Sequence, residues 1–141
     1  MTTTTIAPSS ARVSFRQPVT TEGYVDAGWW PRSRDLTLEM PALLDVLWTA
    51  AREMTRVVYN LSSWEPAPRR IHVAGRLVHL SGYHHHDPLV LSVIDARGTD
   101  RVDFLVIAPE TPPEFAERAL QLASSIGQIQ TPADLFALAQ Q

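Results

Sequence analysis

Short stretches in which apolar and polar residues alternate recur along the chain, and this period of two is typical of half-buried β-strands. One strand is predicted over residues 12–16, where it joins a sheet at an edge. Five more are predicted over residues 56–61, 71–73, 76–80, 89–94 and 102–107. The last of them is apolar on both faces, and we therefore place it inside the sheet.

Two short turns connect these strands in pairs. Ala74-Gly75 fits a two-residue hairpin turn between the strands at 71–73 and 76–80. Ala96-Arg97-Gly98 forms the turn between the last two strands.

Helical spacing of apolar residues replaces the alternation elsewhere. The first predicted helix has three candidate N-cap residues, Ser33, Asp35 and Thr37, and is compatible with Pro41 only within its first turn. Its apolar stripe consists of Met40, Leu43, Leu44, Leu47, Trp48, Ala51 and Met54.

Two further helices are predicted near the end of the chain. Residues 111–114 have the form of a capping box with proline at the first helical position, and Phe115, Ala119, Leu122 and Ile126 continue an amphipathic stripe. A shorter helix begins at residues 131–134. The order of elements predicts an α+β fold: an antiparallel sheet of about five to six strands with two to three helices segregated to one face.

The 141 residues have the length of one domain, and we expect a disordered tail over residues 1–11 and a single α+β domain over 12–141. The absence of cysteine excludes disulfides, thiolate metal sites and a cysteine nucleophile. The first residues lack the features of a secretory signal, and no apolar run is long enough to span a membrane. We therefore expect a cytoplasmic protein without a membrane partner.

The charge of the chain narrows the classes of ligand. All twelve basic side chains are arginines, which removes any mechanism that needs a Schiff-base or P-loop lysine. The formal net charge is −3 and the isoelectric point is about 5.9. Because no basic field surrounds such a chain, nucleic acid is not an expected partner.

Two adjacent tryptophans followed by two arginines stand out in the segment 28–36. Pro31 pushes Trp30 into an extended conformation, so the rings of Trp29 and Trp30 cannot share one helical stripe. We interpret the segment as an ordered loop that its rings hold in place. A third tryptophan, Trp64, anchors a stiff loop over residues 62–68.

Four arginines lie close in sequence to these tryptophans. Arg32, Arg34, Arg69 and Arg70 could converge on a phosphate or carboxylate near a helix N-terminus. Alternatively they pair with Asp26, Asp35 and Glu65 or stack on the tryptophan rings. Asp35 itself is expected to cap the helix.

The leading hypothesis is a non-catalytic binding or interaction module. Its partner is an unknown protein or a small anionic ligand, no cofactor is implied, and a homodimer is compatible with it. The candidate ligand-binding residues are Trp29, Trp30, Arg32, Arg34, Trp64, Arg69 and Arg70.

The histidines support an alternative hypothesis, a small metal-assisted enzyme that uses His72, His79 and Asp87. With Ala74-Gly75 as the hairpin turn, His72 and His79 become diagonal neighbours about 7 Å apart on the face that carries Arg70. Asp87 or the run 84–86 would have to close over them. No histidine spacing matches a known zinc pattern, so no metal ligand is assigned; the alternative is a set of outward polar residues and a solvated loop.

Several strings of the sequence resemble one family. They are Gly23-Tyr24-Val25-Asp26, Trp29-Trp30-Pro31-Arg32-Ser33-Arg34-Asp35-Leu36, Trp64-Glu65-Pro66-Ala67-Pro68-Arg69-Arg70, Gly75-Arg76-Leu77-Val78 and Gly82-Tyr83. Together they are similar to the actinobacterial family called domain of unknown function 5994, over most of the chain beyond the tail. The resemblance implies a small, arginine-rich actinobacterial protein and brings no catalytic or ligand residues. The histidine run at 84–86 departs from the family's pattern.

Overall fold

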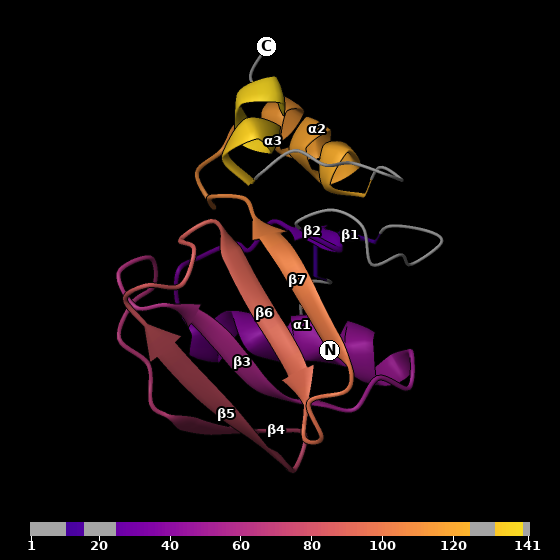
Figure 1. Ribbon diagram of the computed structural model, residues 1–141, viewed down its shortest axis with the longest axis vertical. Coiled ribbons are helices and arrows are strands. Elements are labelled where there is room, and N and C mark those ends of the chain that lie inside the picture. Colours follow the sequence, from indigo (N-terminus) through magenta and orange to yellow (C-terminus); the bar gives the residue numbers. More distant parts are fainter. Residues whose placement is uncertain (1–10, 16–24, 125–131, 140–141) are drawn as a thin grey trace, which may run out of the picture.

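A mixed seven-stranded sheet forms the centre of the part of the chain that the computed structural model describes, namely residues 11–15, 25–124 and 132–139 (Figure 1). The strand order is β1-β2-β7-β6-β3-β5-β4. The strands are β1 (Val13–Phe15), β2 (Ala27–Trp29), β3 (Met54–Asn60), β4 (Arg70–Val73), β5 (Arg76–Tyr83), β6 (Val90–Asp95) and β7 (Arg101–Val106). The helices are α1 (Leu36–Thr49), α2 (Pro113–Ala123) and α3 (Pro132–Ala139).

The α+β class is confirmed, but the prediction of a purely antiparallel sheet of five to six strands is wrong. β2 pairs with β7 and β3 pairs with β5 in parallel, while the other neighbours are antiparallel. The loop after β3 carries the chain past the position of β5, so β4 occupies the far edge and its hairpin partner β5 returns parallel to β3. Alternation within strands does not encode such long connections.

The helices lie on opposite faces of the sheet, which corrects the expectation that they share one face. The buried residues of α1 form one hydrophobic cluster with β3, β5 and the inward side chains of β6 and β7. Those of α2 form a second cluster with Leu105 and Ile107, at the β1–β2–β7 end. In Figure 1, α1 crosses behind the strands, whereas α2 and α3 lie beyond β1 and β2. Consecutive residues of β7 therefore reach different clusters: Phe104 lies in the first and Leu105 in the second.

Trp29 and Trp30 divide between these two clusters, and the segment predicted as a loop contains a strand. Trp29 is the last residue of β2, is 1% exposed and stacks on Trp64 with ring centroids 5.6 Å apart. Trp30 is 8% exposed and belongs to the α2 cluster, where the Arg12 guanidinium covers its ring at 3.6 Å. The extended conformation predicted from Pro31 thus sends the rings to opposite faces.

Gly28 explains how closely α2 approaches β2. A Cβ at this position would lie 3.1 Å from Ala123 and from Leu120, and 3.0 Å from the Ser14 hydroxyl. The same hydroxyl donates a hydrogen bond of 2.6 Å to the Leu120 carbonyl. A larger residue at position 28 would therefore push the helix away from the sheet.

The first predicted helix differs from the structure in three details: the position of Pro41, its C-terminal end and the place of Met54. Asp35 is the N-cap of α1 and accepts from the N–H groups of Thr37 and Leu38, but Pro41 is the sixth helical residue, beyond the first turn. The helix ends at Thr49 because Ala51 adopts a left-handed φ of 62°. Ala51 is therefore exposed outside the stripe, and Met54 begins β3.

The predicted capping box at residues 111–114 does not form. Pro112 is the N-cap of α2, Pro113 is its first residue, and no side chain caps the helix. The buried residues are Ala116, Ala119, Leu120 and Ala123, while Phe115 and Leu122 are half-buried and Ile126 lies outside the described residues. α3 begins at residue 132, within the predicted start.

Both predicted turns are confirmed. Ala74 and Gly75 have positive φ angles of 50° and 80°, and β4 and β5 pair in the predicted register, with Arg70 opposite His79. β6 and β7 pair antiparallel across the turn at 96–100. β1 is an edge strand and β7 lies inside the sheet, as expected.

A bidentate ion pair fixes the β6–β7 turn. Arg52 donates from Nε and Nη2 to the two carboxylate oxygens of Asp100, at 2.9 and 2.5 Å. These bonds hold the pKa of Asp100 below its ordinary value and raise the pKa of Arg52. Within the turn, Asp95 accepts from the N–H groups of Thr99 and Asp100, which lowers the pKa of Asp95. Both carboxylates therefore stabilise the turn in their charged form.

Replacing the buried Trp30 should destabilise the fold strongly. Trp30→Ala removes a ring that is 8% exposed and leaves a cavity under Arg12, so we expect a loss of about 3–5 kcal/mol in the free energy of unfolding. Leu38→Ala is the control, since Leu38 is 68% exposed, and should change it by less than about 0.5 kcal/mol. Denaturant unfolding measures both; equal stability of Trp30→Ala and wild type would contradict this packing role.

Stability should fall in acid through Asp100. Because the folded state lowers this pKa, the charged carboxylate stabilises the fold above about pH 4, and that contribution disappears as the pH falls through the folded value. Asp100→Asn should therefore unfold more easily than wild type at pH 7, with a smaller difference at pH 3. Asp45→Asn, at an exposed site on α1, is the matched control. A difference of the same size at both pH values for Asp100→Asn would rule out this linkage.

Candidate functional site

The seven residues predicted to bind a ligand line three separate cavities. Trp29, Trp30 and Arg32 border one of about 210 Å³ beside the first turns of α1. Arg34 and Trp64 border one of about 150 Å³. Arg69 and Arg70 border a third of about 480 Å³, where β4 begins beside β5. The structure thus does not gather the four arginines around one anion, and ligand binding at these residues stays a prediction.

The tryptophan–arginine segment mostly serves packing. All three rings are buried, so they present no aromatic surface. Arg34 donates to the Ser63 carbonyl and pairs with Glu110 at 3.0 Å, rather than with any of the expected carboxylates. Asp35 caps α1, as predicted, and an Asp26 carboxylate oxygen accepts from the backbone N–H of Asp103.

The structure brings together only some of the residues of the histidine hypothesis. His72 and His79 share a face of the β4–β5 hairpin in the predicted diagonal arrangement. Asp87 accepts from the N–H of Leu89 within its own loop. In the described part of the chain, no three histidine or carboxylate side chains come together in a way that could hold a metal ion. The metal-assisted enzyme therefore stays a prediction.

Asn60 is a buried polar residue that the sequence did not single out. It is 7% exposed, and its amide donates to the backbone carbonyls of His84 and His86 at 3.3 and 2.6 Å. Its side-chain oxygen accepts from the N–H of Ser62. Asn60 thus ties the histidine turn to the end of β3 through backbone contacts.

The strongest candidate site is a row of side chains across the sheet face opposite α1. The row consists of register partners on five neighbouring strands: Arg101 on β7, Ile94 on β6, Arg56 on β3, His79 on β5 and Arg70 on β4. Their neighbours along each strand, such as Val57 and Val78, point into the α1 cluster. Arg56 and Arg70 are exposed, and His79 and Ile94 are half-buried. We call this surface of β6, β3, β5 and β4 the open face.

Most of the arginines on or beside the open face differ from the other arginines in their ion-pair partners. Arg52, Arg76 and Arg101 pair with Asp100, Glu53 and Asp103. Among described residues, no carboxylate pairs with Arg56, Arg69, Arg70, Arg97 or Arg118. All but Arg118 line one of two grooves on or beside the open face. The structure therefore gathers four arginines without a described ion pair there, with the Asp95 carboxylate at the turn end of the first groove.

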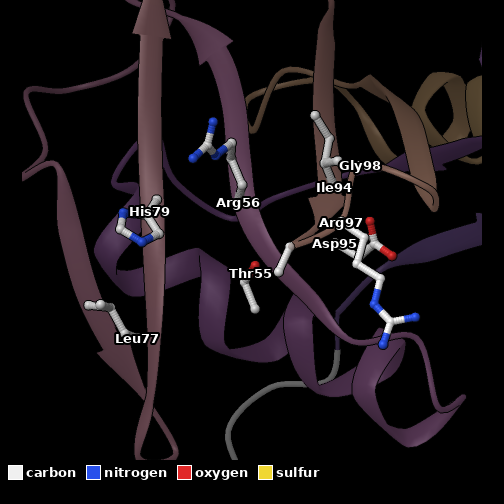
Figure 2. Close-up of a pocket in the computed structure, with 9 residues that line it drawn as sticks. Thr55, Arg56, Leu77, His79, Ile94, Asp95, Arg97 and Gly98 are labelled. Carbon is white, nitrogen blue, oxygen red and sulfur yellow. The ribbon is translucent and has the colours of Figure 1, made fainter.

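Arg56 and His79 separate the two grooves and line both. The first, of about 610 Å³, is bordered by Thr55, Leu77, Ile94 and the turn 95–98. Figure 2 shows Arg56 reaching from β3 towards the strand of His79, with Leu77 further along β5 and Ile94 on β6. The second groove, of about 480 Å³, lies at the start of β4 and includes Arg69, Arg70 and Ser81. This arrangement can hold an anion by charge-assisted hydrogen bonds.

Sequence reasoning missed Arg56 because its neighbours come from distant segments. The alternation that buries Val57 and Tyr59 already places Arg56 on the other face, a usable signal. The parallel pairing of β3 with β5, which sets Arg56 beside His79, has no such local signal.

No helix among the described residues combines the length and the apolar character needed to cross a membrane.

Comparison with known proteins identifies a family without a known activity. No curated protein and no solved structure matches the chain. The model of the family of unknown function DUF5994 matches residues 12–123, which include every strand of the sheet and α1 and α2. This confirms the resemblance to that family, while the expected actinobacterial origin stays a prediction. The chain is a member of the DUF5994 family.

Proposed function

We propose that this chain is a non-catalytic binding module that takes a small anionic ligand on the open face of its sheet. The observation that carries the proposal is the row Arg56–His79–Arg70, in which two arginines without a described carboxylate partner flank a histidine on adjacent strands. The two guanidinium charges lie on the same face, two strands apart, and like charges repel each other. An anion between them removes that repulsion.

The geometry suits an oxyanion. Neighbouring strands lie about 4.8 Å apart, so the backbones of Arg56 and Arg70 are roughly 10 Å apart, within reach of two arginine side chains that turn towards His79. Guanidinium groups bind carboxylate and phosphate oxygens in bidentate fashion, and an imidazole can donate a further hydrogen bond. Arg101, in the same row, already pairs with Asp103 at 2.9 Å and so belongs to the site's boundary.

The proposed site keeps the anionic ligand predicted from the sequence but places it at a different set of residues. Arg70 is common to the sequence-based site and to this one, while Arg34 is engaged with Glu110. The tryptophans contribute by fixing the sheet, since their rings are buried.

Phosphate should stabilise the wild-type chain more than sodium chloride of equal ionic strength. Binding to the folded state alone raises the free energy of unfolding by about 2.7 kcal/mol when the ligand is at 100 times its Kd. Arg56→Gln and Arg70→Gln should lose most of this gain, measured as the shift of the thermal unfolding midpoint.

Arg118→Gln is the matched control, because Arg118 is an exposed arginine of α2 that has no described ion pair and lines neither groove. It should keep the full phosphate effect. Phosphate also stabilises proteins by exclusion from their surface, and that effect would persist in all three variants. An equal shift in all of them would therefore refute binding at the open face.

A further inference from the structure

The first groove is much larger than a bare oxyanion bound to Arg56 and His79 would fill. Its volume of about 610 Å³ falls in the range of small-molecule sites, and Arg56 and His79 occupy one part of its lining. A bare oxyanion at these two residues would leave most of the groove empty. The ligand that fits it has a body beside its anionic group.

Apart from Asp95 and Arg97 in the turn, the rest of the lining is uncharged and includes apolar side chains. Leu77 of β5 is 41% exposed, and Ile94 of β6 is half-buried on the other side of β3. Gly98 borders the groove with open space where a side chain would stand. Figure 2 shows the guanidinium of Arg97 extending away from Arg56, so that Thr55 and Ile94 lie between the two charges.

We propose that the ligand is an amphiphilic organic anion, with its carboxylate or phosphate held by Arg56 and His79 and its apolar body lying over Leu77 and Ile94. Charge complementarity fixes the end that meets Arg56, and the exposed Leu77 fixes the direction in which the body extends along β5. This inference rests on the proposed function, because it names the ligand class of the same site.

The test is a series of straight-chain carboxylates from acetate to octanoate, titrated calorimetrically into the full chain, with inorganic phosphate and 1-octanol as reference ligands. Burial of each methylene group should raise the affinity about two- to fourfold. Octanoate should thus bind at least tenfold more tightly than acetate. Octanol, which lacks the charge, should bind at least tenfold more weakly than octanoate.

Two variants separate the charged end from the apolar groove. Leu77→Ser should flatten the dependence on chain length, so that octanoate loses more affinity than acetate or phosphate, and the exposed position of Leu77 lets the variant fold. Arg56→Gln should weaken every anion, phosphate included. Leu38→Ser, at an exposed leucine of α1, is the matched control and should behave like wild type.

The possible results distinguish the two proposals. If phosphate binds through Arg56 but affinity does not rise with chain length, the amphiphilic ligand is refuted and the anion-binding module stands. If neither phosphate nor any carboxylate depends on Arg56, both fail. If the chain-length dependence survives in Leu77→Ser, or if octanol binds as tightly as octanoate, the apolar body does not lie in this groove with its charge at Arg56, and the inference is wrong.

Discussion

The opposite orientation of two neighbouring rings holds the layers of this molecule together. Extended backbone sends successive side chains to opposite faces, so Trp29 enters the α1 cluster and Trp30 the α2 cluster. Trp64 stacks on the first ring and Arg12 covers the second. Between the strand and α2, Gly28 leaves no side chain in the way. One short strand thereby positions helices on both sides of the sheet.

This arrangement leaves the sheet unequally covered. At the β1–β2–β7 end, helices pack on both faces and residues such as Leu105 and Phe104 are fully buried. At the β3–β5–β4 end, α1 and the Trp64 loop cover one face, and the other carries Arg56, His79 and Arg70. The proposed site lies where the second layer is missing, and the Arg52–Asp100 pair fixes the turn that borders its groove.

Local features of the fold could be predicted from the sequence, because local physics determines them. The Ala74-Gly75 turn fixed the β4–β5 register and the diagonal of His72 and His79. Asp35 was among the expected caps. The parallel pairs and the two-sided placement of the helices could not be predicted, because they depend on contacts between segments far apart in the sequence. The site was only partly predicted for the same reason: Arg70 was identified, but Arg56 gains its meaning from the pairing of β3 with β5.

The unequal covering also separates the residues that fold the chain from those that would meet a ligand. Arg56, Arg70 and Leu77 are exposed and contribute little to either hydrophobic cluster, whereas Gly28 and Trp29 are confined on every side. Surface substitutions usually change stability little, while changes in a packed core are costly. Within such a scaffold, ligand preference can diverge through the open face of the sheet while the tryptophan strand and its two helices stay the same.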